Sequence, residues 1–500
     1  EPCMSILEQL KPVLQASATL GGAMSWDGWI AEQEARAQKV QLYRDYADGE
    51  HRASLTKEMR AMLRLDASAS GAPFNLNHCD NIVSTMADRL ELAQIEADND
   101  AGTEWAQNLL QFNRIDGVQL GVHEAAIRDG DTFVMVSFDN AAGRAHFSHE
   151  EAFDGTEGML VVYPDRRATQ PALAIKVWTV TSEGGRLGDS ARVNLYFPDR
   201  IEKYLVKDGA LDRFEVEGEP WPATWTFSNG DPIGVPVIHF SNRAVRYNPF
   251  GKSEIDDAIP IQDAINRTMV SMVMASELTA FQIRVAKGFV PPSAITPGMW
   301  VQILLKDADG NPVTEIDESM ARFLQTADVS ALEQGDLAPF IEQQKFLIDQ
   351  LYTISKTPRS DTGSDIASGE SLKQREIGLL GKVKRAQMSF GNAWEDVLAL
   401  AHRIESVYAR ETPPAVGRFT SKWKSAEIRD EDKLVESAVK IADHIDPETF
   451  LETVASRFGW DDKKIKTILE RRQAETAQQT AQAFGALPGF GNGFNPERFN

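Results

Sequence analysis

Gly251, Lys252 and Ser253 stand directly before a predicted helix, which is how a phosphate-binding loop ends. Such a loop also needs a glycine five positions earlier and several free backbone amides, because these amides hold the phosphate oxygens. The earlier position is Arg246, and Pro249 lacks an amide hydrogen. The run is therefore predicted to be a turn into a helix, and we do not expect it to bind ATP.

His146, His149 and Glu150 form the closest grouping of histidine and carboxylate side chains. On a strand or loop they could bind a metal, but the helical His-Glu-x-x-His spacing of zinc hydrolases is absent. A solvated sheet edge is the favoured interpretation. The other histidines are scattered and no nucleophile elbow is present, so the sequence reveals no catalytic centre.

Asp307, Asp309 and Gly310 resemble part of a calcium-binding loop. Aligning Gly310 with the glycine of such a loop puts Leu305 at the first ligand position and Ile316 where the bidentate acid belongs. A tight hairpin turn explains the three residues better. No metal and no cofactor is predicted.

The acidic balance of the chain limits how it can bind other molecules. Its 500 residues include 52 Lys and Arg against 74 Asp and Glu, a formal net charge of −22. A protein that holds nucleic acid through many phosphate contacts needs a clustered excess of cations, so that class is disfavoured. A hydrophobic content of 42% is typical of globular proteins, and the length predicts several domains.

Cysteine content and hydropathy give expectations about the compartment. Cys3 and Cys79 are too few for a disulfide scaffold, which favours assembly in a reducing environment. The opening residues lack the basic region of a signal peptide. The most apolar stretch, 269–285, contains Glu277 and Arg284, so no membrane span is predicted and a soluble protein is expected.

Periodicity predicts an α+β protein. The opening reads as mostly helical to about Arg128, with Asn77 capping a helix that runs to Leu90. From Asp131 onward apolar residues alternate at period two, which predicts an antiparallel, meandering sheet. The expected strands are 132–138, 159–163, 173–181, 193–197, 203–206 and 235–240.

Long helices dominate the second half of the prediction. A proline-free apolar stripe over 371–410 indicates a helix of about 40 residues, on the order of 60 Å long. That length exceeds a small domain, so this helix should bridge domains or act as a spine. The other expected segments are a helix from Pro260 to about 281, a β unit with strands 301–305 and 313–316, a helix ending at Ile354, a helix-breaking loop over 356–369, and charged helices over 427–444, 447–458 and 461–483.

This order of elements and several short motifs resemble the portal proteins of tailed bacteriophages, in particular those of long-tailed phages that infect Gram-positive hosts. The motifs span nearly the whole chain, and their order and spacing carry the resemblance together. They are Tyr43, Tyr46 and Gly49; Asn75, Asn77, Cys79, Ile82, Val83, Asp88, Arg89 and Leu90; Gly130, Asp131, Phe133 and Val134; Gly251, Ser253, Ile255, Gln262, Asp263, Asn266, Glu277 and Ala280; and Ser368, Gly369, Glu370, Leu372, Lys373 and Trp394.

The resemblance implies a portal fold with a mixed α/β wing, a two-helix stem, a small α/β clip, a long spine helix and a helical crown. Carried over to this numbering, the implied parts are an N-terminal segment (1–26), the wing (27–254), a stem helix (255–283), the clip (284–331), a second stem helix (332–355), a tunnel loop (356–368), the spine helix of the wing (369–410), the crown (411–483) and a flexible tail (484–500).

The resemblance also implies a function. Portal proteins form a ring, usually of twelve subunits, at one capsid vertex of the virion, after assembly in the host cytoplasm. The ring is a channel for packaging and ejection of double-stranded DNA, which it contacts without sequence preference. The implied partners are further copies of the chain, the large terminase subunit, the head-tail adaptor, and the major capsid and scaffold proteins. The implied role is structural and not enzymatic.

Two groups of site residues follow from the resemblance. In and beside the tunnel loop, the residues expected to face DNA are Lys356, Thr357, Pro358, Arg359, Ser360, Asp361, Lys345 and Lys373. In the clip, those expected to contact partner proteins are Trp300, Lys306, Asp307, Asp309 and Asn311. Few cations on a strongly acidic ring suit a conduit, because many simultaneous phosphate contacts would stop the DNA from sliding.

Two alternatives stay open at this point. One is a nucleotide- or metal-dependent hydrolase that uses Lys252 and Ser253 or the cluster of His146 and His149. The other is a different structural subunit of a capsid or tail.

Overall fold

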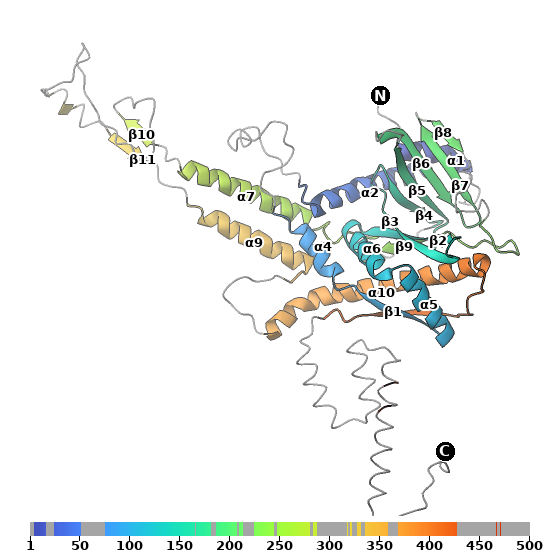
Figure 1. The fold of residues 1–500 in the computed structure, drawn as a ribbon. Helices are drawn as coiled ribbons and strands as arrows, with labels where there is room; N and C mark the ends of the chain where they lie inside the picture. Colours follow the sequence, from blue (N-terminus) through green and yellow to red (C-terminus); the bar gives the residue numbers. More distant parts are fainter. Residues whose placement is uncertain are drawn as a thin grey trace, which may run out of the picture. The chain divides into compact units, whose positions relative to one another are not determined.

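The computed structural model describes residues 5–16, 25–51, 76–165, 167–181, 187–207, 210–213, 225–244, 248–280, 284–287, 318, 321–322, 328–331, 336–358, 369–427, 467 and 471. Helices and strands are mixed, which confirms the α+β class (Figure 1). The chain divides into two compact units. Unit 1 comprises Glu1–Gln41, Val83–Ser253 and Asp361–Asn500, and unit 2 comprises Leu42–Ile82 and Glu254–Ser360.

A five-stranded antiparallel meander is the largest sheet of unit 1, as the period-two pattern predicted. Leu160 and Val162 pack on one face with residues of α1 and α2, whereas Met159 and Val161 pack on the other face with Phe133 of a second sheet. Burial of both faces explains the apolar character of these strands. The elements are α1 (Ile6–Ala16), α2 (Trp26–Ala47), β4 (Gly158–Val162), β5 (Leu173–Thr181), β6 (Leu187–Tyr196), β7 (Ile201–Lys207) and β8 (Ala210–Arg213).

The second sheet of unit 1 has the order β3-β2-β9. β2 (Asp131–Asp139) and β9 (Val237–Ser241) match the predicted strands. β3 (Arg144–Glu151) was not predicted because its sequence is mostly polar, yet it pairs with β2 from Thr132↔Glu151 to Asp139↔Arg144. Pairing with an apolar neighbour, and not its own composition, makes this segment a strand.

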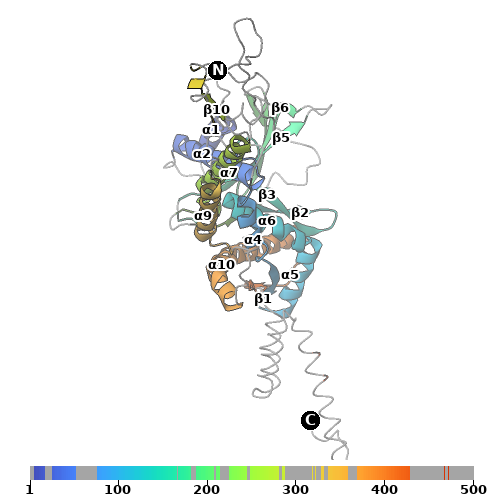
Figure 2. The ribbon, with the colours of Figure 1, turned by 90° about the vertical axis from the view of Figure 1, so that its left-hand side faces the viewer.

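The spine helix is α10 (Gly369–Tyr408), 40 residues long, as the uninterrupted stripe predicted. It packs against β2, β3 and β9 and carries the fully buried side chains of Phe390 and Trp394. Figure 2 shows α10 beside α5 (Asp100–Phe112) and α6 (Ile115–Asp129) in unit 1.

Two short strands correct the prediction of a purely helical opening and of helices alone after the spine. β1 (Leu92–Ala97) lies in the opening and pairs with β12 (Phe419–Trp423). Asn77 does accept hydrogen bonds from the amides of Cys79 and Asp80 at 3.1 and 3.3 Å, which confirms the predicted helix start. That helix, α4 (Cys79–Ala87), ends before Leu90.

Unit 2 contains the two predicted stem helices, α7 (Ile259–Ala280) and α9 (Ala338–Ser355), which pack together. Pro260 lies in the first turn of α7, where its missing amide hydrogen costs no hydrogen bond. β10 (Arg284–Lys287) pairs with β11 (Asp328–Ala331), and this ladder was not predicted. The predicted β unit over 300–323 and the helices expected beyond residue 427 lie outside the described residues, apart from single positions.

Within the described ranges, every helix is either too short or too polar to cross a bilayer.

Candidate functional site

The Gly251-Lys252-Ser253 run is a closed turn in unit 1, as predicted. The Gly251 amide donates to Oδ1 of Asp131 at 2.7 Å, and the Lys252 amide donates to the carbonyl of Asn242 at 2.7 Å. The Ser253 hydroxyl donates to the Arg128 carbonyl. Because the first two amides of the run bond to the protein itself, the turn lacks the amide nest that phosphate binding requires.

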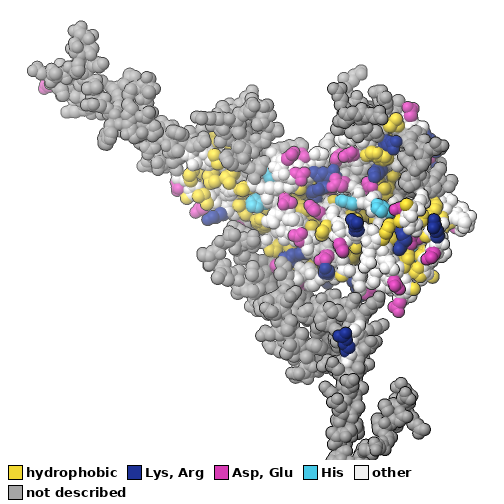
Figure 3. Space-filling view, in the orientation of Figure 1, with side chains coloured by type: hydrophobic (Ala, Val, Ile, Leu, Met, Phe, Trp, Pro, Cys, Tyr) yellow, Lys and Arg dark blue, Asp and Glu magenta, His cyan; other side chains and the backbone are white. Residues whose placement is uncertain are grey.

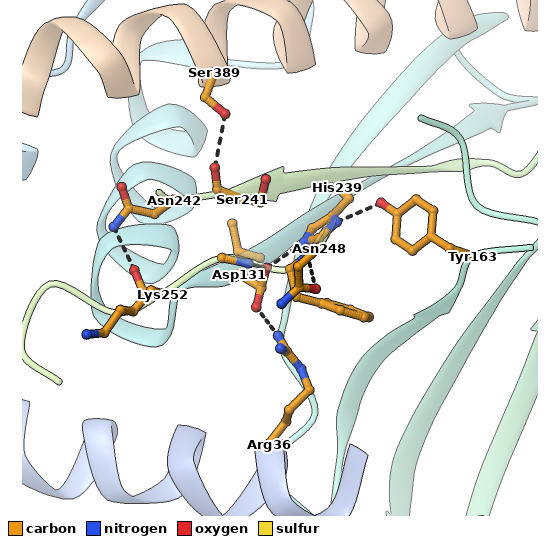
Figure 4. A network of polar contacts seen from close by, with 12 residues as sticks. Arg36, Asp131, Tyr163, His239, Ser241, Asn242, Asn248, Lys252 and Ser389 are labelled. Carbon is orange, nitrogen blue, oxygen red and sulfur yellow. Dashed lines mark hydrogen bonds and ion pairs between the residues drawn. The ribbon is translucent and has the colours of Figure 1, made fainter. Parts of the chain in front are cut away.

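Asp131 is the centre of the polar network around this turn (Figure 4). Its carboxylate accepts hydrogen bonds from Arg36, from His239 Nε2 at 2.7 Å and from the Gly251 amide. Since a carboxylate only accepts, His239 carries a proton on Nε2, and its Nδ1 forms a hydrogen bond with the Tyr163 hydroxyl at 2.8 Å. The network thus joins α2, β2, β9 and the end of β4.

The electrostatics of the network favour the ionised form of Asp131, although the side chain is only 2% exposed. Burial by itself would raise the pKa of Asp131, but Arg36 and the hydrogen bonds from His239 and Gly251 together hold that pKa below its ordinary value. Burial, with the Asp131 charge as a smaller cause, raises the pKa of Tyr163. Asp131, His239 and Tyr163 are all hydrogen-bonded within the network. This arrangement is typical of a network that stabilises the fold and not of a catalytic site.

The histidine cluster does not form a metal site. His146 and His149 are three residues apart on β3, so their side chains leave opposite faces of the sheet. His149 Nε2 bonds to the Thr132 hydroxyl at 2.8 Å, and Glu150 pairs with Lys176 at 2.7 Å. In the part of the chain that the structure describes, no three His, Cys, Asp or Glu side chains are grouped to hold a metal.

A second polar network anchors the α7/α9 pair within unit 2. Gln262 and Asn266, one turn apart on α7, bond to the backbone of residues 76–78: Gln262 Oε1 accepts from the His78 amide at 3.0 Å, and Asn266 Oδ1 accepts from the Leu76 amide at 3.1 Å. Both side chains are fully buried. They satisfy backbone groups that burial would otherwise leave unpaired.

Two tyrosines from the end of α2 extend this network along α7. Tyr43 donates to Asp256 at 2.7 Å, and Tyr46 donates to Asp263. His51 stacks on the Tyr46 ring and bonds to Asn266 Nδ2 at 2.6 Å. We call Tyr43, Tyr46, His51, Asp256, Gln262, Asp263 and Asn266 the polar root of the α7/α9 pair.

Tyr352 fixes the far end of α9, where the predicted tunnel loop begins. Its hydroxyl accepts from Asn81 Nδ2 at 2.9 Å and contacts His78 Nδ1 at 3.3 Å. Lys356 then closes α9 in the left-handed conformation, with φ of 56°. A lysine at this position also complements the partial negative charge of the helix end.

The structure places only part of the predicted DNA-facing set. Lys345 and Lys356 are exposed and Thr357 is buried in unit 2, next to Pro358. Lys373 belongs to α10 in unit 1, so it shares no helix with the other lysines. Arg359, Ser360 and Asp361 lie outside the described residues, and so do the predicted clip residues Trp300, Lys306, Asp307, Asp309 and Asn311.

α9 carries three large apolar side chains that are exposed on different sides of the helix. Leu351 is fully buried, whereas Phe346 is 61% exposed and Ile341 and Ile354 are also exposed. At 100° per residue Phe346 points almost opposite to Leu351. Figure 3 shows apolar side chains gathered over the α7/α9 pair. Phe346, the most exposed of the three, offers apolar area to another molecule.

No local pattern in the sequence marks Asp131 or the polar root as a functional network. Their partners come from distant parts of the chain, such as Arg36, Asp131 and His239 in one case and Tyr43 and Asp256 in the other. Among 74 acidic residues, no local pattern marks the buried ones. The sequence could have pointed to these networks only through the family motifs. Five members of the networks belong to those motifs: Tyr43, Tyr46, Asp131, Gln262 and Asn266.

Comparison with known proteins agrees with this architecture. A family profile described as phage portal protein, SPP1 Gp6-like, matches residues 29–478. The portal protein of Mycobacterium phage D29 is 27% identical over 271 residues, which are 52% of this chain and 50% of the relative. The portal protein of Mycobacterium phage L5 is 26% identical over 219 residues, 42% of each chain. The matched segments thus span half or less of the curated relatives, while the family profile covers most of this chain. The chain belongs to the SPP1 Gp6-like family of phage portal proteins.

Proposed function

We propose that copies of this chain close into a ring, of about twelve subunits as the family resemblance implies, at one vertex of a phage capsid, and that the ring is a channel for double-stranded DNA during packaging and ejection. The observation that carries the proposal is the match to the portal family over residues 29–478, and the exposed Phe346 on α9 supports it. A ring of identical subunits needs head-to-tail contacts between two different surfaces of the chain. Phe346 supplies apolar area for one such contact.

The charge of the chain suits a conduit. With a net charge of −22 per copy, the ring cannot hold DNA by neutralising many phosphates at once. Screening over about 8 Å at physiological ionic strength keeps the acidic wall from excluding the duplex. DNA is therefore free to slide.

A small set of cations makes transient contacts with the DNA backbone in this proposal. Lys345 lies on α9, and Lys356 closes the helix eleven residues later, about 15 Å further along its axis. Both are exposed. Arg359, Ser360, Asp361 and Lys373 join them at the tunnel loop, with Thr357 and Pro358 as the loop's rigid start.

The remaining partners follow from the position of a portal ring in the virion. Trp300, Lys306, Asp307, Asp309 and Asn311 contact the large terminase subunit during packaging and the head-tail adaptor afterwards. The major capsid and scaffold proteins surround the ring during assembly in the host cytoplasm. The ring itself is structural and not an enzyme: its energy comes from the terminase.

The hydrolase alternative loses its support. Lys252 and Ser253 lie in a closed turn, and His146 and His149 point to opposite faces of β3. Neither group assembles a site.

Complementation of a phage that lacks its portal gene tests the function. Particles made with the chain should contain a full genome, and those made without it should be empty. Lys345→Glu/Lys356→Glu should slow packaging, whereas Lys39→Glu, a matched reversal of an exposed lysine on α2, should not. Full particles in the absence of the chain would overturn the proposal.

A further inference from the structure

One side of α10 in unit 1 is exposed and combines apolar and basic chemistry. Ile377 and Met388 are 65% and 58% exposed and three turns apart, so they lie on the same side of the helix. Between them, Lys384 and Arg385 are exposed, and a Cβ added at Gly381 would meet no atom within 4 Å. We call Ile377, Gly381, Lys384, Arg385 and Met388 the α10 face.

One side of α6 in the same unit combines apolar and acidic chemistry. Asp116, Leu120 and Glu124 are exposed at intervals of four residues, so they form one stripe, and Leu120 is 50% exposed. The adjacent Gly117 also has open space around it. We call Asp116, Gly117, Leu120 and Glu124 the α6 face.

We propose that the α10 face of one copy binds the α6 face of the next copy. The inference rests on the proposed ring and names a contact within it. A basic surface and an acidic surface on one unit cannot be a twofold contact of like with like, but they suit a head-to-tail contact that repeats around a ring.

The spacing of the two faces matches. Leu120 fits the open gap at Gly381, where Ile377 and Met388 provide its apolar walls. Asp116 and Glu124 are then each about 6 Å along α6 from Leu120, and Lys384 and Arg385 are about 5–6 Å along α10 from Gly381. Whichever way the two helices run, one of the two acids therefore lies opposite the cations.

Charge reversal tests whether the charged residues of the two faces contact each other between copies. Lys384→Glu/Arg385→Glu and, separately, Asp116→Lys/Glu124→Lys place like charges across every contact in a ring. Mass photometry of the purified full-length chains should show that each variant needs about tenfold or more higher concentration for half-assembly. Lys39→Glu/Arg418→Glu, which reverses two exposed cations outside both faces, should assemble like the wild type.

An equimolar mixture of the two variants provides the decisive test. In an alternating ring the reversed α10 face meets the reversed α6 face, and the two unchanged faces also meet, so the mixture should recover assembly to within about threefold of the wild type. Circular dichroism and thermal unfolding of each variant alone establish that both are folded.

The outcomes separate the two levels of the proposal. A wild-type chain that stays monomeric contradicts the ring. A wild-type chain that assembles, together with variants that assemble equally well or a mixture that does not recover, contradicts the α10/α6 contact and leaves the ring intact.

Discussion

Trp394 donates its indole Nε1 hydrogen to Nε2 of His123 across 3.0 Å, so α10 is joined to α6 at a site without access to water. His123 donates its Nδ1 hydrogen to the Leu90 carbonyl at 2.8 Å and stacks on Phe390 with 5.3 Å between ring centroids. The imidazole of His123 is therefore neutral in the folded protein. Burial lowers the pKa of His123 to about 4, against a smaller opposing effect of the Leu90 hydrogen bond.

This histidine makes the folded state sensitive to mild acid. The unfolded chain takes up a proton at His123 near pH 6.5, whereas the folded chain does so only near pH 4. Between these values the unfolded state binds more protons, so the free energy of unfolding should fall by about 3 kcal/mol as the pH drops from about 6.5 to about 4. Urea unfolding as a function of pH measures this slope. His123→Phe should be less stable but should lose the His123 share of this slope, about 3 kcal/mol, whereas exposed His146→Ala should keep it. An unchanged slope in His123→Phe contradicts the assignment.

Asp131 should hold unit 1 together through its charge. Asp131→Asn keeps the shape but leaves Arg36 and His239 without a carboxylate, and breaking a buried pair in this way costs about 3–5 kcal/mol. Because its pKa is lowered in the folded state, the stabilisation is present above the ordinary carboxyl pKa and is lost as the pH falls through the lower folded value. Chemical unfolding at neutral pH measures the loss in the free energy of unfolding. Asp139→Asn at the other end of β2 is the control, and an equal effect of both variants would contradict a special role for Asp131.

Gly251 should tolerate no larger side chain. A Cβ at this position would lie 2.1 Å from the Gly130 carbonyl and 2.4 Å from the Asn242 carbonyl, so the backbone would have to move. Gly251→Ala should lower the free energy of unfolding by about 3 kcal/mol or more and weaken the bond from its amide to Asp131. Gly28→Ala, on helix α2 with only ordinary contacts near 3.5 Å, should be neutral or stabilising by up to about 1 kcal/mol. Thermal unfolding compares the two variants, and similar melting temperatures would rule out the close approach.

Tyr352 should control how firmly α9 is held at its end. Tyr352→Phe removes the hydroxyl that meets Asn81 and His78, at a cost of about 1 kcal/mol. Amide hydrogen exchange in the last turn of α9 should then be about fivefold faster. Gln343→Ala, at an exposed position earlier on α9, is the control. Equal exchange in Tyr352→Phe and the wild type would show that the hydroxyl does not anchor the helix.

Long local patterns predicted their elements well. α10 is close to the expected 371–410 because forty residues without proline share one apolar stripe. The meander β4–β7 likewise follows its alternation. In both cases the information lies within each segment, where periodicity can report it.

Strands that form only by pairing with a distant segment of the chain were not predicted. β1 and β12 are five- or six-residue strands that pair across more than 300 positions, from Ala97↔Phe419 to Leu92↔Trp423. β3 is polar and is held by its ladder to β2. Of the candidate site, the sequence placed Lys345 on a helix that ends near Ile354 and Lys356 at the start of the loop after it, which agrees with the end of α9 at Ser355. It could not show that Asp131 or the polar root would be buried and joined, since burial is a property of the assembled units.

Closure of copies of this chain into a ring is tested most directly by cryo-electron microscopy of the purified chain at micromolar concentration. We expect closed rings of about twelve subunits around a central opening wide enough for a DNA duplex, with the outer side of α9 at Phe346 covered by a neighbouring copy. Monomers or open, irregular aggregates, with Phe346 still exposed to solvent, would contradict the proposal.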